Sequence, residues 1–193
     1  QAVSALRHRF LNPGKEKSMA QKECLILQDL QIAIQMEEDG KKFYEQAAQK
    51  AKDAGTKDIF TYLANGEVYH IKRIQEIYNS LEKNPQWQES MCDFSPPPED
   101  PKIFSAALAK GNMAAGDADD LKALEIGMQM ETKSIEFYQR LARQAQDPME
   151  RRFLMSLVNE ERGHYNYLAD YRNYLVDPAD WYFIKEMGHV DGA

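Results

Sequence analysis

Two stretches of the chain decide its fold, because they repeat one pattern. Residues 31–70 are QIAIQMEEDGKKFYEQAAQKAKDAGTKDIFTYLANGEVYH, and residues 125–164 are EIGMQMETKSIEFYQRLARQAQDPMERRFLMSLVNEERGH. At a shift of 94 positions the two stretches align without a gap and are identical at 13 of 40 residues. Two unrelated amphipathic hairpins would share alanines and leucines, but not Glu, Phe-Tyr and His at one offset. The chain is therefore predicted to contain an internal duplication.

Both copies have the period of amphipathic helices. Breaks in this period come at Asp53-Ala54-Gly55 and at Asp147-Pro148, where proline suits the first turn of a new helix. We therefore predict four long helices, over about residues 21–52, 56–83, 118–146 and 149–175. The inward stripes of the first copy contain Leu30, Ile34, Glu37, Tyr44 and Ala48, then Phe60, Leu63, Glu67, His70 and Ile74.

A segment unlike either copy joins the second predicted helix to the third. Residues 85–117 contain Ser95-Pro96-Pro97-Pro98 and a stretch at about 101–109 that suits a short helix. This length of chain predicts one crossover along the bundle instead of a tight turn. The predicted fold is all-α: a four-helix bundle over residues 20–176, made of two duplicated antiparallel hairpins with one long crossover connection.

The two ends of the chain differ from the bundle in composition. Residues 1–19 contain one acidic residue and several basic ones, so we expect an N-terminal extension, either disordered or added ahead of a domain that begins near Ala20. Residues 177–193 hold Trp181, Tyr182 and Phe183. This aromatic C-terminal tail is expected to fold onto the bundle or onto a partner subunit.

Composition and charge exclude several classes of function. The net charge of -7 and the pI near 5.2 argue against a nucleic-acid surface and against binding to an anionic membrane. No apolar run approaches the roughly 20 residues that a membrane helix needs. Cys24 and Cys92 lie far apart and form no C-x-x-C pair, so the chain has no disulfide framework, although one disulfide between them stays open. We expect a cytoplasmic protein.

Charged residues occupy inward positions where apolar residues are expected. Burying one unpaired carboxylate is costly, so such a group takes up a proton or finds a cation. Four glutamates and two histidines without a buried Lys or Arg on the same stripes need about four positive charges, which two divalent ions supply. The predicted metal ligands are Glu37, Glu67, His70, Glu131, Glu161 and His164.

The spacing of these residues predicts that they meet in one layer. In each copy the two glutamates are separated by 30 residues across a turn, which places them at nearly the same height in an antiparallel hairpin. In Glu67-Val68-Tyr69-His70 and Glu161-Arg162-Gly163-His164, the i, i+3 spacing puts both ligands on one helical face. One Glu from each of two helices plus Glu-x-x-His from each of the other two is the ligand set of di-iron carboxylate bundles.

Over about residues 21–175 the chain resembles the rubrerythrin branch of the ferritin-like superfamily. The matching motifs are Met36-Glu37 with Tyr44, Glu67-x-x-His70, Met130-Glu131 with Tyr138, and Glu161-x-x-His164. The resemblance implies a ferritin-like fold in which Glu37 and His70 are terminal ligands of one metal and Glu131 and His164 of the other, while Glu67 and Glu161 bridge both. It also implies that Tyr44 and Tyr138 lie near the site, either hydrogen-bonded to a bridging carboxylate or as ordinary core tyrosines.

The chain departs from the family pattern in two ways. Full-length rubrerythrins carry a rubredoxin domain with four cysteines, and this sequence has no counterpart. Typical members also carry a further glutamate three residues after the third-helix ligand, where this chain has Ser134, with Gly40 at the symmetric position. The ligand exchange that the family links to peroxide reduction is therefore not implied here.

The resemblance implies an oxidoreductase with two iron ions, although manganese or a mixed pair would accept the same ligands. The oxidant would be hydrogen peroxide or dioxygen, and a separate electron donor such as rubredoxin would restore the reduced metals. A homodimer or a larger homo-oligomer is expected. Two other functions stay open: a ferroxidase or iron-storage protein, and a structural or metal-sensing bundle with a static dimetal site.

Overall fold

The computed structural model describes residues 13–92 and 117–190, with side chains over 26–92 and 117–185. This part of the chain is helical and contains no strand, so the all-α prediction is confirmed. The long helices are α1 (Pro13–Lys50), α2 (Ala54–Lys83), α4 (Ala118–Gln144) and α5 (Pro148–Val176). Two shorter elements accompany them, the 3-10 helix η1 (Glu89–Cys92) and the C-terminal helix α6 (Pro178–Val190).

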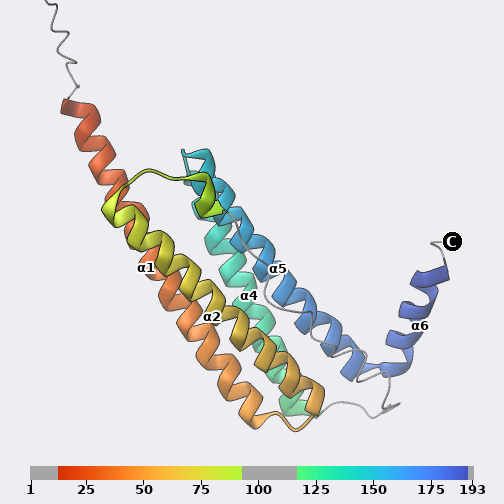
Figure 1. Ribbon diagram of the computed structural model, residues 1–193. Helices are drawn as coiled ribbons and strands as arrows, with labels where there is room; N and C mark the ends of the chain where they lie inside the picture. Colours follow the sequence, from red (N-terminus) through yellow and green to blue (C-terminus); the bar gives the residue numbers. More distant parts are fainter. Residues whose placement is uncertain (1–12, 93–116, 191–193) are drawn as a thin grey trace, which may run out of the picture.

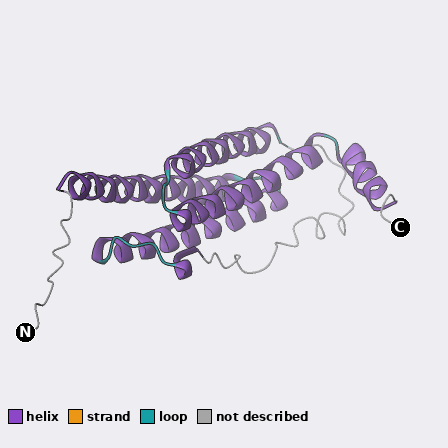
Figure 2. Cartoon of the chain, turned by 90° about the horizontal axis from the view of Figure 1, so that it is seen from above, coloured by secondary structure: helices purple, strands orange, loops and turns teal. Residues whose placement is uncertain are grey.

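The long helices form two antiparallel hairpins that lie side by side. Helices α1 and α2 make one hairpin, and helices α4 and α5 make the other (Figures 1 and 2). Between the hairpins, α1 contacts α4 and α2 contacts α5. The first turns of α1 run past the end of the bundle (Figure 1). No helix in the described ranges combines the length and the apolar character that are needed to cross a membrane.

Most helix boundaries fall within two residues of the predicted ones, and three of the starts share one capping device. Asp53, Asp117 and Asp147 each accept a backbone N–H from the first turn of the following helix, at 2.8, 2.9 and 2.7 Å. Helix α1 begins at Pro13, eight residues before the predicted start, because proline suits the first helical turn and no strong breaker follows Gly14. The short helix predicted at about 101–109 lies outside the described residues.

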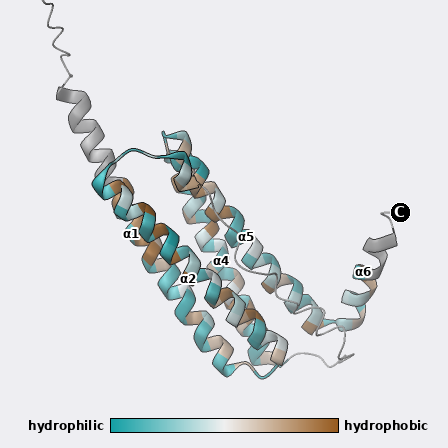
Figure 3. Cartoon of the chain, in the orientation of Figure 1, coloured by the Kyte–Doolittle hydropathy of each residue, from teal (hydrophilic) through white to brown (hydrophobic). Residues whose placement is uncertain are grey.

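The core consists of two apolar clusters, one toward each end of the bundle. One cluster includes Leu30, Ile74 and Phe153, and the other includes Phe60 and Leu168. Figure 3 shows hydrophobic and hydrophilic residues alternating along each long helix, as expected for helices that bury one face.

The turn of the first hairpin is anchored to both helices of the second. Asp120, at the start of α4, accepts the backbone N–H of Lys52 at 3.2 Å and that of Asp53 at 2.8 Å. The Tyr171 hydroxyl of α5 donates to the Asp53 carboxylate at 2.5 Å. A Cβ added at Gly55 would lie 1.8 Å from that hydroxyl, so glycine is required for the approach. These contacts fix the relative height of the two hairpins.

The C-terminal tail forms α6, which leaves the end of α5 at an angle (Figure 1). Trp181 is buried, packs edge-to-face on Tyr174 with ring centroids 5.4 Å apart, and donates its indole N–H to Asp170 at 3.0 Å. Phe183 and Ile184 are 60% and 59% exposed. The tail therefore folds back onto α5 through Trp181, while the next two apolar side chains face outward.

Candidate metal centre

All six predicted ligands meet in the interior of the bundle, between the two apolar clusters. Each of the four long helices contributes at least one of them, and α2 and α5 contribute two each because the Glu-x-x-His spacing places both side chains on one face. None of the six is more than 3% exposed. They are Glu37 on α1, Glu67 and His70 on α2, Glu131 on α4, and Glu161 and His164 on α5.

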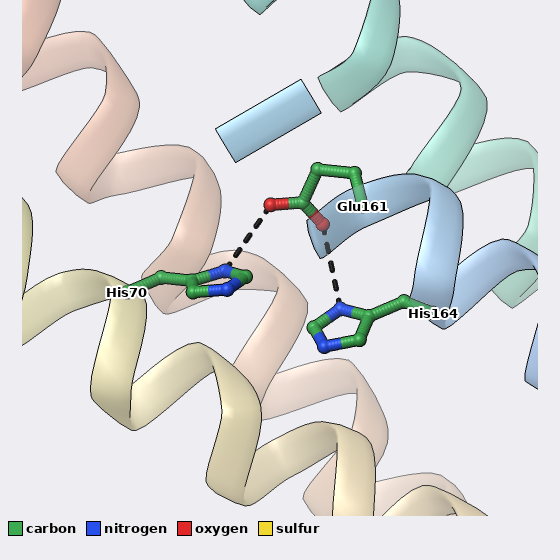
Figure 4. A group of neighbouring side chains, drawn as sticks. All are labelled: His70, Glu161 and His164. Atoms are coloured by element: carbon green, nitrogen blue, oxygen red, sulfur yellow. Dashed lines mark ion pairs between the residues drawn. The ribbon is translucent and has the colours of Figure 1, made fainter. Parts of the chain in front are cut away.

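Carboxylates from three helices surround the His70 side chain. Its Nδ1 lies 3.1 Å from Oε1 of Glu161, 3.3 Å from Oε2 of Glu37 and 3.4 Å from Oε2 of Glu67. The other oxygen of Glu161 lies 3.4 Å from Nδ1 of His164, so this carboxylate stands between the two histidines (Figure 4).

His164 has a matching set of neighbours. Its Nδ1 lies 3.4 Å from Oε2 of Glu161, 3.7 Å from Oε1 of Glu131 and 3.8 Å from Oε1 of Glu67. The two imidazole rings are stacked, with centroids 5.2 Å apart and an angle of 20° between their planes. The histidines are therefore adjacent, and each presents its Nδ1 to carboxylates.

These side chains form two groups, each of which could hold a metal ion. One group is Glu37, Glu67, His70 and Glu161, and the other is Glu67, Glu131, Glu161 and His164. Within each group, one ligand atom from every residue lies within 4.8 Å of the others. Glu67 and Glu161 belong to both groups, so two ions held in this way would share two carboxylates.

Tyr44 and Tyr138 reach across from one hairpin to the other. The Tyr44 hydroxyl donates a short hydrogen bond to Glu131, and the Tyr138 hydroxyl donates one to Glu37. Both rings are buried. The acceptors are therefore Glu37 and Glu131, each of which belongs to one donor group, and not the carboxylates that the two groups share.

Burial and mutual repulsion raise the pKa of three of the carboxyl groups. Removal from water is the largest cause for Glu67, Glu131 and Glu161, and neighbouring carboxylates add to it. Glu37 differs. Burial raises its pKa too, but hydrogen bonds from Glu67, His70 and Tyr138 and the charge on His70 lower it to about 2.

The two histidines are shifted in opposite directions. Burial lowers the pKa of both rings. At His70 the charge of Glu161 and the close carboxylates of Glu161, Glu37 and Glu67 outweigh burial, so the pKa is well above its ordinary value. At His164 burial prevails and the pKa is lowered. Without a cation, these shifts favour the protonated forms of His70, Glu67 and Glu131.

The orphaned atoms at the centre fit a pair of metal ions. Among the described side chains, Oε2 of Glu67, both oxygens of Glu161 and both ring nitrogens of His164 are buried without a hydrogen-bond partner. Such groups are rare in native interiors, and a bound water or ion would satisfy them. Carboxylate oxygens and imidazole nitrogens are ligands that iron and manganese both accept.

Sequence reasoning missed Tyr62, which contacts the centre without offering a ligand. The rings of Tyr62 and His164 form a T-shaped contact with their centroids 6.4 Å apart. The duplication did not point to Tyr62, because its counterpart in the other hairpin is Ser156. Gly40 lies against Glu67, where an added Cβ would be 3.4 Å from Oε1. Ser134, at the symmetric position, is half-buried.

Structural comparison finds this bundle in other proteins. A hypothetical protein from Pyrococcus furiosus, Pfu-1136390-001, is 23% identical with a TM-score of 0.55, and the match covers 77% of this chain and 89% of that one. A two-domain protein from Anabaena variabilis ATCC 29413, with DJ-1/ThiJ/PfpI-like and ferritin-like domains, is 15% identical with a TM-score of 0.55. That match covers 90% of this chain and 44% of the larger protein. Both likenesses concern the fold.

Sequence comparison identifies the family. No curated protein matches the chain. The family model for rubrerythrin matches residues 29–171, a range that contains all six converging side chains and both cross-hairpin tyrosines. The matched range is most of the sequence, and the chain therefore belongs to the rubrerythrin family.

Proposed function

We propose that the protein is a di-iron oxidoreductase that reduces hydrogen peroxide or dioxygen with electrons from a separate donor. One observation carries the proposal: two groups of four buried donors share the carboxylates of Glu67 and Glu161. Two ions that share carboxylates lie close enough to act on one small oxidant together. Membership of the rubrerythrin family supports iron over other metals.

Each residue has a distinct place in this proposal. Glu37 and His70 would hold one iron, Glu131 and His164 would hold the other, and Glu67 and Glu161 would serve both. When bound, the iron pair supplies the reversible change of oxidation state that the reaction needs.

The rest of the centre positions ligands and manages protons. Tyr138 and Tyr44 hold the two terminal glutamates by donating hydrogen bonds to Glu37 and Glu131. Such supporting bonds orient the ligands of metal sites. The surrounding apolar clusters limit the access of bulk water, which favours a small oxidant over a large substrate.

We propose that the electron donor is a separate molecule. The described part of the chain offers Cys92 as its one cysteine side chain, which cannot form a four-thiolate iron centre. A small one-electron carrier such as rubredoxin suits this role.

The test combines metal analysis with turnover. Purified protein is loaded with Fe(II), and iron per chain is measured alongside peroxide consumption with reduced rubredoxin as the donor. We expect two irons per chain and repeated turnover, both lost in the Glu67→Gln/Glu161→Gln double variant. Two irons without turnover would refute the oxidoreductase, and uptake of many irons per chain would indicate storage instead. Absence of bound iron would refute the di-iron site itself.

A further inference from the structure

The backbone of α2 comes unusually close to the ring of His164 at one residue. Gly66 is buried and directly precedes Glu67. A Cβ added at this glycine would lie 2.8 Å from Nε2 and 2.9 Å from Cε1 of His164. Contacts under about 3 Å between such atoms do not occur in proteins, so any side chain here would move the ring or the helix.

The ring has little room to yield. His164 is 3% exposed and is stacked on His70, and Tyr62 makes a T-shaped ring contact with the same imidazole. Its Nδ1 already faces three carboxylates at 3.4 to 3.8 Å. A push on the Nε2–Cε1 edge therefore displaces Nδ1 relative to those carboxylates.

Among the described residues, no protein group accepts a hydrogen bond from the second ring nitrogen of His164. The second ring nitrogen of a metal-ligating histidine usually donates its proton to a carboxylate, a backbone carbonyl or water. At His164 that nitrogen is Nε2, and it faces the backbone of Gly66.

We propose that Gly66 is the positioning residue for His164: the bare backbone at this glycine fixes the ring, and so the place of Nδ1, by contact instead of by a hydrogen bond. The inference rests on the dimetal site of the proposed function. It makes the two metal positions unequal, because the duplicated residue at the equivalent place in the other hairpin is Glu160, and not a glycine.

A second glycine in the same region provides a matched control. Gly163 lies in α5, next to His164 itself, and a Cβ added there would have no atom within 4 Å. Alanine is the better helix former, so Gly163→Ala should raise the melting temperature slightly and leave metal binding unchanged. Gly66→Ala makes the same chemical change where space is missing.

The expected effect is confined to one metal. Metal–ligand distances tolerate only about 0.2 Å of change. An added Cβ needs the ring to move farther than that, since 2.8 Å must grow to at least 3.4 Å for ordinary contact. We expect Gly66→Ala to bind one ion as the parent does and the second about 10- to 100-fold more weakly, the range seen when supporting residues of metal sites are changed.

The experiment titrates the metal-free protein with Co(II) and follows visible absorption, whose intensity reports the coordination of each ion. The parent, Gly66→Ala and Gly163→Ala are compared, with melting temperatures measured without metal. The same glycine substitutions are also made in a His70→Ala background, in which the His164 position is the complete one. There, Gly66→Ala should weaken the remaining site by about the same 10- to 100-fold, and Gly163→Ala should leave its affinity unchanged.

The outcomes separate the inference from the proposed function. Two tight cobalt ions in Gly66→Ala, equal weakening of both ions, or the same loss in Gly163→Ala would each overturn the positioning role. A rise in melting temperature for Gly66→Ala that matches that of Gly163→Ala would also count against it. If the parent binds two metals but does not reduce peroxide, the proposed function falls and the role of Gly66 stands on the titration.

Discussion

Oε1 of Glu161 lies 3.1 Å from Nδ1 of His70, so a carboxylate of α5 faces an imidazole of α2 across the bundle. The same carboxylate places its other oxygen 3.4 Å from His164. No ligand on α1 or α4 has this reach, because Glu37 and Glu131 each belong to a single group of donors. This difference between shared and unshared carboxylates leads to the first prediction.

We expect Glu67→Gln and Glu161→Gln to reduce metal content more than Glu37→Gln and Glu131→Gln. A shared carboxylate binds both ions and screens their mutual repulsion, whereas a terminal one is a single ligand that water can replace. The amide keeps the shape of the side chain, so the comparison isolates the charge. Elemental analysis after dialysis should give less than one metal per chain for the shared pair and between one and two for the terminal pair. Equal metal content in all four variants would contradict the assignment.

Without metal, the order of stability should reverse. Four carboxyl groups crowd the centre, and burial and repulsion raise the pKa of three of them. Replacing Glu161 by Gln removes one source of repulsion. The metal-free variant should therefore have a free energy of unfolding higher than that of the metal-free parent by about 1 kcal/mol or more, and it should melt at a higher temperature. With Fe(II) added the parent should be the more stable one, because bound metal stabilises only the folded state. A variant that is less stable in both conditions would argue that these side chains are paired by hydrogen bonds and not held for metal.

The two tyrosines should affect opposite metal positions. Tyr44→Phe removes the donor to Glu131, and Tyr138→Phe removes the donor to Glu37. Each loss should cost about 1–3 kcal/mol of stability in the metal-free protein, because it leaves a buried carboxyl oxygen without its donor. We expect each to weaken one of the two bound metals by about tenfold. Metal titration of each variant in the His70→Ala background distinguishes them, since only Tyr44→Phe should then weaken the remaining ion.

Glu150 gives a pH dependence that does not involve the metal centre. Burial, with smaller contributions from the charges of Asp147 and Asp29, raises the pKa of Glu150 to about 7, and Arg151 opposes the shift. The unfolded chain loses this proton near pH 4.5. The folded protein therefore holds a proton that the unfolded chain has released, and its stability falls as the pH rises from about 4.5 through about 7.

Glu150→Gln should remove this loss. We expect a gain of about 1 kcal/mol at about pH 8, less than the full shift implies because Glu150 is partly exposed and lies at a helix N-terminus, and no gain at about pH 4. Thermal melting across that range is the measurement, with Glu136→Gln on the exposed face of α4 as the control. An equal change at both pH values would show that the effect is not due to ionisation.

The sequence was sufficient for the architecture and for the convergence of six side chains, because both follow from strong periodic signals. The 94-residue repeat and the 30-residue spacing of glutamates within each hairpin fix which residues share a layer. Asp53 and Asp147, at the breaks in the helical pattern, also cap α2 and α5. The same two positions therefore predict where these helices begin and how far along them the ligands lie.

The side-chain contacts between the two hairpins could not be predicted from these periodic patterns. Tyr44 reaches Glu131, which lies 87 residues away, and no local pattern states which glutamate a tyrosine will meet. The approach of Gly66 to His164 depends on how closely α2 and α5 pack, and in the sequence Gly66 and Gly163 look alike. The start of α1 was missed for another reason: the apolar pattern marks where a helix is buried, and not where it begins.

The division of donors between the hairpins has a consequence for synthesis of the protein. The first group of donors takes Glu37, Glu67 and His70 from the N-terminal hairpin, but its fourth member, Glu161, belongs to α5. A nascent chain that has emerged only as far as the crossover thus carries three donors and lacks the carboxylate that closes either group. Complete loading then waits until translation has passed Glu161 and α5 has docked. On the proposed function, complete metal uptake would therefore require a chain synthesised to the end of α5 with both hairpins paired.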